Sequence, residues 1–245
     1  MDKILKIKDL IENSFNIIVF TGAGISVGSG IPDFRSSNGL YNQKNKLNIS
    51  PEEIISHTFF YKNTSDFFKF YKEKMVYENA TYNAAHKFFA DLEILNKNIT
   101  IITQNIDGLH SLAGSTNVLE LHGTIHKNHC TKCHRFYPLK EILKSRDIPG
   151  CECGGIIKPD VVLYEESLDY NTLTQSIRQI ANADLIIVVG TSLVVEPAAS
   201  LLRYYKGDNL VIINKNKTPY DVYASICIND DIITVIKELN PIIFR

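Results

Sequence analysis

The sequence predicts an α/β fold in which a doubly wound parallel sheet carries a smaller inserted lobe. Four short apolar runs rich in β-branched residues indicate buried parallel strands, and Gly, Asn, Gln or Thr follows each run within one or two residues. The runs cover residues 17–20, 99–103, 184–189 and 210–213. Helical patterns lie between them, and strands that alternate with helices are typical of a doubly wound sheet.

The segments between the predicted strands have recognisable helix signals. The sequence Ser-Pro-Glu-Glu at residues 50–53 offers an N-cap, a proline suited to the first helical position and a glutamate that can complete a capping box. Residues 84–95 and 171–180 place their apolar side chains on one helical face. A further helix is expected to begin at Pro197 and to end at Gly207.

Two stretches interrupt the alternation of strands and helices, and we assign both to the smaller lobe. Residues 36–82 are rich in aromatic side chains and lysine, and residues 123–158 contain four of the five cysteines. We therefore expect one domain over residues 1–245. Its large lobe should comprise residues 1–35, 83–122 and 159–245, and its small lobe a helical insertion at 36–82 and a cysteine-bearing module at 123–158.

Length and composition restrict the class of protein. The chain has 245 residues, 44% of them hydrophobic, which is enough to bury a core without help from a partner. Because 26 Lys and Arg face 27 Asp and Glu, the chain lacks the positive field that nucleic-acid binding requires. The charged N-terminus predicts no signal peptide, and no apolar run approaches the roughly 20 residues that cross a bilayer. We expect a cytoplasmic monomer that binds neither nucleic acid nor membrane.

A glycine-rich turn follows the first predicted strand. Residues 21–32 read TGAGISVGSGIP, so the backbone can approach a pyrophosphate that faces a helix N-terminus. The match to G-x-G-x-x-G is imperfect, because Val27 stands where the third glycine is expected and Gly28 follows one residue later. The turn favours a Rossmann-like, dinucleotide-binding sheet, and a plain strand-to-helix turn is the alternative.

Four clustered cysteines predict a metal site. They are Cys130, Cys133, Cys151 and Cys153. Four thiolates can hold one tetrahedral zinc ion with no position left open for catalysis, so the site should be structural. The second pair is one residue tighter than C-x-x-C, His129 or His134 is close enough to replace a thiolate, and a reduced cluster without metal is the alternative. Cys227 stands apart, and we expect it to be a packed core thiol.

Further blocks follow the glycine turn in order along the chain. They are residues 22–35 (GAGISVGSGIPDFR), 103–110 (TQNIDGLH), 120–123 (ELHG), 158–162 (KPDVV) and 190–193 (GTSL). Over about residues 14–230 the chain resembles the sirtuin family of NAD-consuming protein deacylases. The resemblance implies that the chain uses NAD to remove an acyl group from lysine, transferring the group to ADP-ribose and releasing nicotinamide.

The resemblance also implies the catalytic residues. His122 matches the family histidine that activates a ribose hydroxyl after nicotinamide leaves, and imidazole suits proton transfer near neutral pH. Without the family context, His122 would be interpreted as a satisfied side chain at a strand end. Asn105 and Asp107 follow a predicted strand at its carboxyl end, where α/β sheets present ligand groups, and in the family they order the ribose and the nicotinamide.

The cofactor-binding residues are taken from the same motifs. By resemblance they are Gly22, Ala23, Gly24, Ser26, Asp33, Phe34, Arg35, Tyr41, Gln104, Asn105, Ile106, Asp107, His122, Gly190, Thr191, Ser192, Asn214 and Ile228. Asp33 and Arg35 could instead form a solvated ion pair, and Gly190 and Ser192 taken alone are ordinary turn formers. NAD as co-substrate and one structural zinc ion are the cofactors that we expect.

The substrate side of the site is predicted from two further segments. Val161, Val162 and Leu163 resemble the family strand that pairs with an extended peptide through main-chain hydrogen bonds, although such apolar residues could simply be core. Members that remove acidic acyl groups carry Tyr and Arg three residues apart on a small-lobe helix. An ungapped placement puts Phe68 and Tyr71 there.

Acyl preference follows from that placement. Without a guanidinium to bind a carboxylate, we expect acetyl or longer apolar acyl groups to be preferred over succinyl or malonyl. The neighbouring Lys69, Lys72 and Lys74 leave open that one of these cations reaches the site.

Other functions remain compatible with these motifs. A protein mono-ADP-ribosyltransferase could use the same NAD site with another nucleophile. A non-catalytic NAD-binding sensor and a zinc-dependent nucleic-acid module are the alternatives from other classes. The set of Asn105, Asp107 and His122 favours catalysis, and the balanced charge disfavours the nucleic-acid module.

Overall fold

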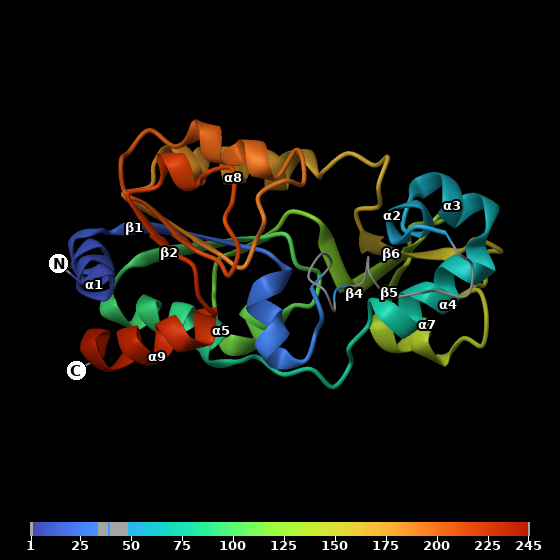
Figure 1. The fold of residues 1–245 in the computed structure, drawn as a ribbon. Helices are drawn as coiled ribbons and strands as arrows, with labels where there is room; N and C mark the ends of the chain where they lie inside the picture. Colours follow the sequence, from blue (N-terminus) through green and yellow to red (C-terminus); the bar gives the residue numbers. More distant parts are fainter. Residues whose placement is uncertain (1, 34–38, 40–48, 245) are drawn as a thin grey trace.

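The computed structural model describes residues 2–33, 39 and 49–244 of the chain. Figure 1 shows two lobes, a large one that carries both chain ends and a smaller one on the far side of the molecule. The prediction of a doubly wound parallel sheet with a smaller inserted lobe is confirmed.

The large lobe is built on a sheet whose paired strands run parallel. The strands stand in the order β3-β2-β1-β7-β8-β9. They are β1 (Asn16–Thr21), β2 (Asn98–Thr103), β3 (Val118–Glu120), β7 (Leu185–Val189), β8 (Leu210–Ile213) and β9 (Ile226–Ile228). The chain continues from β1 to β2 on one side and returns to β7 on the other, so the strand order reverses beside β1. Ligands of such sheets bind outside the carboxyl ends of the strands at this reversal.

Alternate side chains of β1 enter two different cores. Ile17 and Val19 are buried with side chains of α1 (Lys3–Asn13), α5 (Ala84–Asp91) and α9 (Ile232–Ile243). Ile18 and Phe20 are buried with side chains of α8 (Tyr170–Ala181) and the 3₁₀ helix η4 (Ala199–Tyr204). Because successive side chains of a strand point to opposite faces, one apolar strand holds both helical layers, which lie above and below the sheet in Figure 1.

The helices lie close to their predicted positions, with two changes of helix type. The predicted helix 84–95 is α-helical to Asp91 and ends as the 3₁₀ helix η3 (Leu92–Leu95). The segment expected to be a helix from Pro197 to Gly207 forms only the short 3₁₀ helix η4. Ser50 caps α2 (Pro51–Ile54), and its Oγ accepts the Glu53 N–H at 3.2 Å. Within the described ranges, no helix is both long and apolar enough to cross a bilayer.

The small lobe joins two distant segments of the chain around one apolar core. The first segment forms α2, α3 (His57–Lys62) and α4 (Thr64–Lys74), and the second includes α7 (Leu139–Lys144). An antiparallel sheet in the order β5-β4-β6 completes the lobe, with β4 (Gly123–Cys130), β5 (Phe136–Pro138) and β6 (Ile157–Val161). Phe60 and Phe67 pack in one cluster with Ile125 and Val161. Val161 lies at the end of β6, so this strand extends past residue 158, where the sequence analysis placed the end of the small lobe.

Candidate active site and metal centre

A cavity of about 860 Å³ lies where the carboxyl ends of the large-lobe strands meet the small lobe. Gly22, Gln104 and Gly190 line it directly after β1, β2 and β7, and Met75 and Val161 line it from the small lobe. Pockets for small molecules have volumes of roughly 300–1,000 Å³. The cavity therefore has both the size and the position expected of a nucleotide site in this type of sheet.

Main-chain contacts hold the turn after β1 against the turn after β7. The Gly24 N–H donates to Gly190 O at 2.8 Å. A Cβ on Gly24 would lie 2.7 Å from Gly190 Cα, and a Cβ on Gly190 would lie 2.4 Å from the Ile25 nitrogen. Gly190 also has a φ of +60°, which glycine adopts without strain. The turn continues as the 3₁₀ helix η1 (Ala23–Ser29), so no α-helix begins at the glycine motif.

Replacing Gly190 with alanine is expected to destabilise the protein more than the same change at Gly114. Both residues have positive φ, +60° and +109°, so each variant carries backbone strain of roughly 1–2 kcal/mol. Within the described ranges, a Cβ on Gly114 would have no atom within 4 Å, whereas a Cβ on Gly190 would overlap main-chain atoms. We expect an additional loss of about 1–3 kcal/mol for Gly190→Ala, measured as the free energy of unfolding in urea. Equal losses for the two variants would contradict this assignment.

Ser26 connects the two polar side chains that follow β2. Its Oγ donates to Asp107 Oδ2 at 2.7 Å and accepts the Asn105 Nδ2–H at 3.1 Å. The Asn105 N–H donates to Thr103 Oγ1 at 3.0 Å. Ser26 is fully buried and Asn105 nearly so. The network fixes Asn105 and Asp107 beside each other at the wall of the cavity.

Two buried histidines lie behind this network. His110 Nε2 is 3.0 Å from Thr21 Oγ1, and the ring of His86 packs edge-on against the ring of His110 at 4.8 Å. Burial lowers the pKa of His86 to about 4 and that of His110 to about 3, so both rings are neutral at physiological pH. The sequence interpretation missed both residues, although His110 closes the TQNIDGLH motif that carries Asn105 and Asp107.

His122 lines the same cavity with a defined orientation. Its Nδ1 lies 3.0 Å from Gln104 O, and because a carbonyl only accepts, Nδ1 carries the proton and Nε2 is left as the basic nitrogen. Burial lowers the pKa of His122, an effect that the hydrogen bond to Gln104 O opposes. The His122 carbonyl accepts the Val162 N–H at 3.0 Å, which links the histidine to the segment that follows β6.

The structure brings most of the predicted cofactor residues together. The cavity is lined by Gly22, Ala23, Gly24, Ser26, Asp33, Gln104, Asn105, Ile106, Asp107, His122, Gly190, Thr191, Ser192 and Asn214. Phe34, Arg35 and Tyr41 lie outside the described residues. Ile228 does not line the cavity: it packs against the large-lobe core, and its carbonyl accepts the Asn214 N–H at 3.1 Å. Lys215 and Asp231, which form an ion pair at 2.9 Å, also line the cavity, and no motif marks them.

The substrate side of the cavity agrees with only part of the prediction. Val161, Val162 and Leu163 line the cavity. Phe68 and Tyr71 do not, because both are fully buried inside the small-lobe core, where burial raises the pKa of Tyr71. Lys74 and Met75, one helical turn further along, line the cavity where α4 ends. The ungapped placement thus falls on a buried part of α4, whereas the carboxyl end of this helix lines the cavity.

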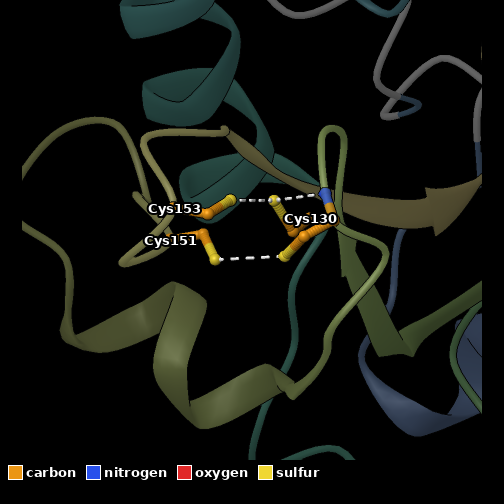
Figure 2. Close-up of side chains that lie close together, drawn as sticks. Cys130, Cys151 and Cys153 are labelled. Atoms are coloured by element: carbon orange, nitrogen blue, oxygen red, sulfur yellow. Dashed lines mark hydrogen bonds between the residues drawn. The ribbon is translucent and has the colours of Figure 1, made fainter.

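The four clustered cysteines come together between β4 and the hairpin that precedes β6, and three of them are labelled in Figure 2. Their Sγ atoms all lie within 4.8 Å of one another. Cys130 Sγ is 3.4 Å from Cys153 Sγ, and Cys133 Sγ is 3.6 Å from Cys151 Sγ. Tetrahedral zinc with bonds of about 2.3 Å to sulfur separates its thiolates by about 3.8 Å. The arrangement fits one structural zinc ion.

The surroundings of the cysteine cluster favour thiolates from cysteine alone. The Tyr137 hydroxyl donates to Cys151 Sγ at 3.1 Å and lowers the pKa of that thiol to about 6. His129 Nδ1 is 2.8 Å from Asp160 Oδ1, so this histidine is engaged outside the cluster. Cys227 lies apart, half-buried, and its Sγ donates to Asp221 O at 3.6 Å.

Known proteins resemble the chain in both sequence and structure. The model of the Sir2 family matches residues 22–197. The chain is 54% identical to an NAD-dependent protein deacetylase of Clostridium tetani, over 95% of each chain, and 54% identical to one of Clostridium perfringens, over 97% of this chain and 98% of that protein. It superposes on a Sir2 variant in complex with deacetylated p53 peptide and 3′-O-acetyl ADP-ribose with a TM-score of 0.91, at 36% identity and 98% coverage of each chain. A complex of Sir2 with p53 peptide and NAD⁺ gives a TM-score of 0.83, at 37% identity, over 99% of this chain and 97% of that one.

Proposed function

The chain belongs to the Sir2 family, and we propose that it is an NAD-dependent protein lysine deacetylase that transfers the acyl group from lysine to ADP-ribose and releases nicotinamide. One observation carries the proposal for the site residues. Asn105, Asp107 and His122 line a single cavity together with the glycine turn after β1 and the apolar segment Val161 to Leu163. The proposed base, the turn proposed to hold the dinucleotide and the proposed peptide edge therefore lie in one place.

The turns after β1 and β7 are suited to hold the pyrophosphate of NAD. Gly22, Gly24 and Gly190 line the cavity, and because they lack side chains the two turns pack directly against each other to form its floor. When bound, NAD supplies the ribose carbon that accepts the acyl oxygen and the nicotinamide that leaves. Asn105 and Asp107, held by Ser26, would orient the reacting end of the cofactor.

His122 is proposed as the general base. Its Nδ1–H is committed to Gln104 O, and Nε2 is the nitrogen that can take a proton from a ribose hydroxyl. Val162, whose N–H binds the His122 carbonyl, belongs to the edge proposed to pair with the acyl-lysine peptide. The base and the peptide edge are therefore fixed relative to each other by a main-chain hydrogen bond.

The proposal is tested by incubating the protein with NAD and an acetyl-lysine peptide. We expect nicotinamide release that depends on the peptide, together with a peptide mass reduced by one acetyl group. A mono-ADP-ribosyltransferase would instead increase the mass of the acceptor protein. A sensor would bind NAD in calorimetry without releasing nicotinamide. Either result would refute the deacetylase.

We further propose that the chain acts as a cytoplasmic monomer on acyl-lysine proteins and binds no nucleic acid. The near-equal numbers of acidic and basic residues support the last point, and a thiolate cluster is most easily maintained in a reducing compartment. Light scattering of the purified protein tests the monomer, because a dimer would double the measured mass.

Acetyl-lysine is expected to be a better substrate than succinyl-lysine by roughly tenfold or more in kcat/KM. The wall of the cavity contains Met75, Ile106 and Ile125, which suit an apolar acyl chain. Lys74 is the residue of α4 in this wall that could bind a carboxylate. An ammonium group is a point charge and lacks the planar, bidentate geometry with which arginine binds a carboxylate.

The acyl preference is measured with two peptides that differ only in the acyl group. The Lys74→Met variant serves as the control for charge in the cavity. Faster turnover of succinyl-lysine, abolished in Lys74→Met, would contradict the prediction and identify Lys74 as the carboxylate-binding residue.

A further inference from the structure

The turn that carries Asn105 and Asp107 is held on one side by a strand of the small lobe. Strand β4 runs alongside this turn, and the Ile125 N–H donates to Ile106 O at 3.0 Å. The next residue, His126, places Nε2 at 3.0 Å from Asp107 O. Because the carbonyl can only accept, Nε2 carries the hydrogen of this bond. Two successive residues of β4 therefore bind two successive peptide groups of the turn.

The imidazole of His126 also covers the next residue of the turn. Gly108 has a φ of +72°, and a Cβ at this position would lie 2.7 Å from both Cδ2 and Nε2 of His126. The ring thus occupies the space that a side chain on residue 108 would need, while its N–H binds the preceding carbonyl. This combination makes the contact specific in both distance and direction, although His126 itself is exposed.

The Asp107 carboxylate depends on the same peptide groups. Its Oδ2 accepts the Ser26 hydroxyl at 2.7 Å, and its Oδ1 accepts the Leu109 N–H at 2.9 Å. The main chain on both sides of Asp107 must keep its orientation for the carboxylate to hold both bonds. From the small lobe, the Ile125 N–H binds the peptide group before Asp107, and the hydrogen bond from His126 to Asp107 O holds the peptide group after it.

We propose that His126 is a positioning residue for the deacetylation reaction, acting through the Asp107 peptide. The inference rests on the proposed function, because it assumes that Asp107 orients bound NAD. His126 does not line the cavity and touches no reacting atom. Its contribution is to keep the Asp107 carboxylate aligned, so its loss weakens productive NAD binding and leaves peptide binding unaffected.

The His126→Phe variant separates the hydrogen bond from the packing. Phenylalanine keeps a ring over Gly108 and removes the N–H that binds Asp107 O. We expect KM and Kd for NAD to rise roughly fivefold, the scale of one lost hydrogen bond, with KM for the peptide unchanged. The His126→Gln variant restores a donor and should recover most of the loss.

His129→Phe is the matched control, because His129 lies on the same strand and binds Asp160 instead of the turn. This control should leave KM for NAD unchanged, and all three variants should unfold at similar temperatures. An NAD affinity in His126→Phe equal to that of the wild type, or a loss equal to that of His129→Phe, would overturn the proposal. So would a loss that Gln does not restore and that follows the unfolding temperature. Calorimetric Kd values keep this test independent of the activity: a wild-type protein without nicotinamide release would refute the proposed function alone.

Discussion

The His122→Ala variant is expected to lose about 10²- to 10⁴-fold in kcat for deacetylation while keeping its fold. Alanine removes the proposed general base and leaves the remaining cavity wall unchanged. The backbone of His122 accepts from Val162, and this hydrogen bond survives the substitution. NAD binding should therefore persist, and the deficit should appear in the steps that follow release of nicotinamide.

The pH profile of the wild type provides a second measurement of the same residue. Burial lowers the pKa of His122, so the ring stays neutral, and basic, as the pH falls to the ordinary imidazole value of about 6.5. Activity that depends on this base should decline only below that pH.

Formation of deacetylated peptide in His122→Ala at the wild-type rate, with His129→Ala as the control, would remove His122 from its assigned role.

Loss of the zinc ion is expected to unfold the small lobe and abolish activity. Four thiolates close the site, and closed four-cysteine sites contribute directly to folding free energy, about 10–16 kcal/mol in zinc-finger peptides. The cluster ties the end of β4 to the hairpin that precedes β6, so its release removes a cross-link at one end of the β4–β6 pair. We expect Cys133→Ser to lose the metal and to unfold at a much lower temperature.

This expectation is measured with a zinc indicator on denatured protein and with circular dichroism on heating. The wild type should release about one zinc ion per chain, as a single closed site requires. Cys227→Ser is the matched control, because this cysteine lies outside the cluster and its loss should change neither zinc content nor unfolding temperature. Chelated protein that retains the wild-type unfolding temperature would disprove a structural role for the metal.

The central part of the sheet can be predicted from sequence because its strands are buried on both faces. Strands β1, β2, β7 and β8 appear as continuous apolar runs for that reason. Strands β3 and β9 stand at the two edges of the sheet with three residues each and are only partly buried, so no run of comparable length marks them. The segment at residues 197–207 has the apolar content of a helix, and only six of its residues adopt the 3₁₀ form.

The site could be predicted where its residues follow one another in motifs and could not where tertiary packing selects them. The segments 103–110 and 120–123 brought Asn105, Asp107 and His122 to one cavity. Sequence spacing could not show where α4 meets the cavity, and it placed Phe68 and Tyr71 there in place of Lys74. His126 belongs to none of the motifs, and its contact could not be predicted because its partner is a main-chain carbonyl 19 positions earlier in the chain.

The contact between Gly24 and Gly190 has a consequence for how this enzyme can change over evolutionary time. At Gly24 and Gly190 main-chain atoms set the spacing of the two turns, so this contact does not depend on the side chains of the cavity walls. If Lys74 and Met75 contact the acyl substrate as proposed, substitutions there can alter which acylated proteins are accepted while the floor of the cavity stays in place. New substrate preferences can therefore arise without rebuilding the part of the molecule that handles NAD.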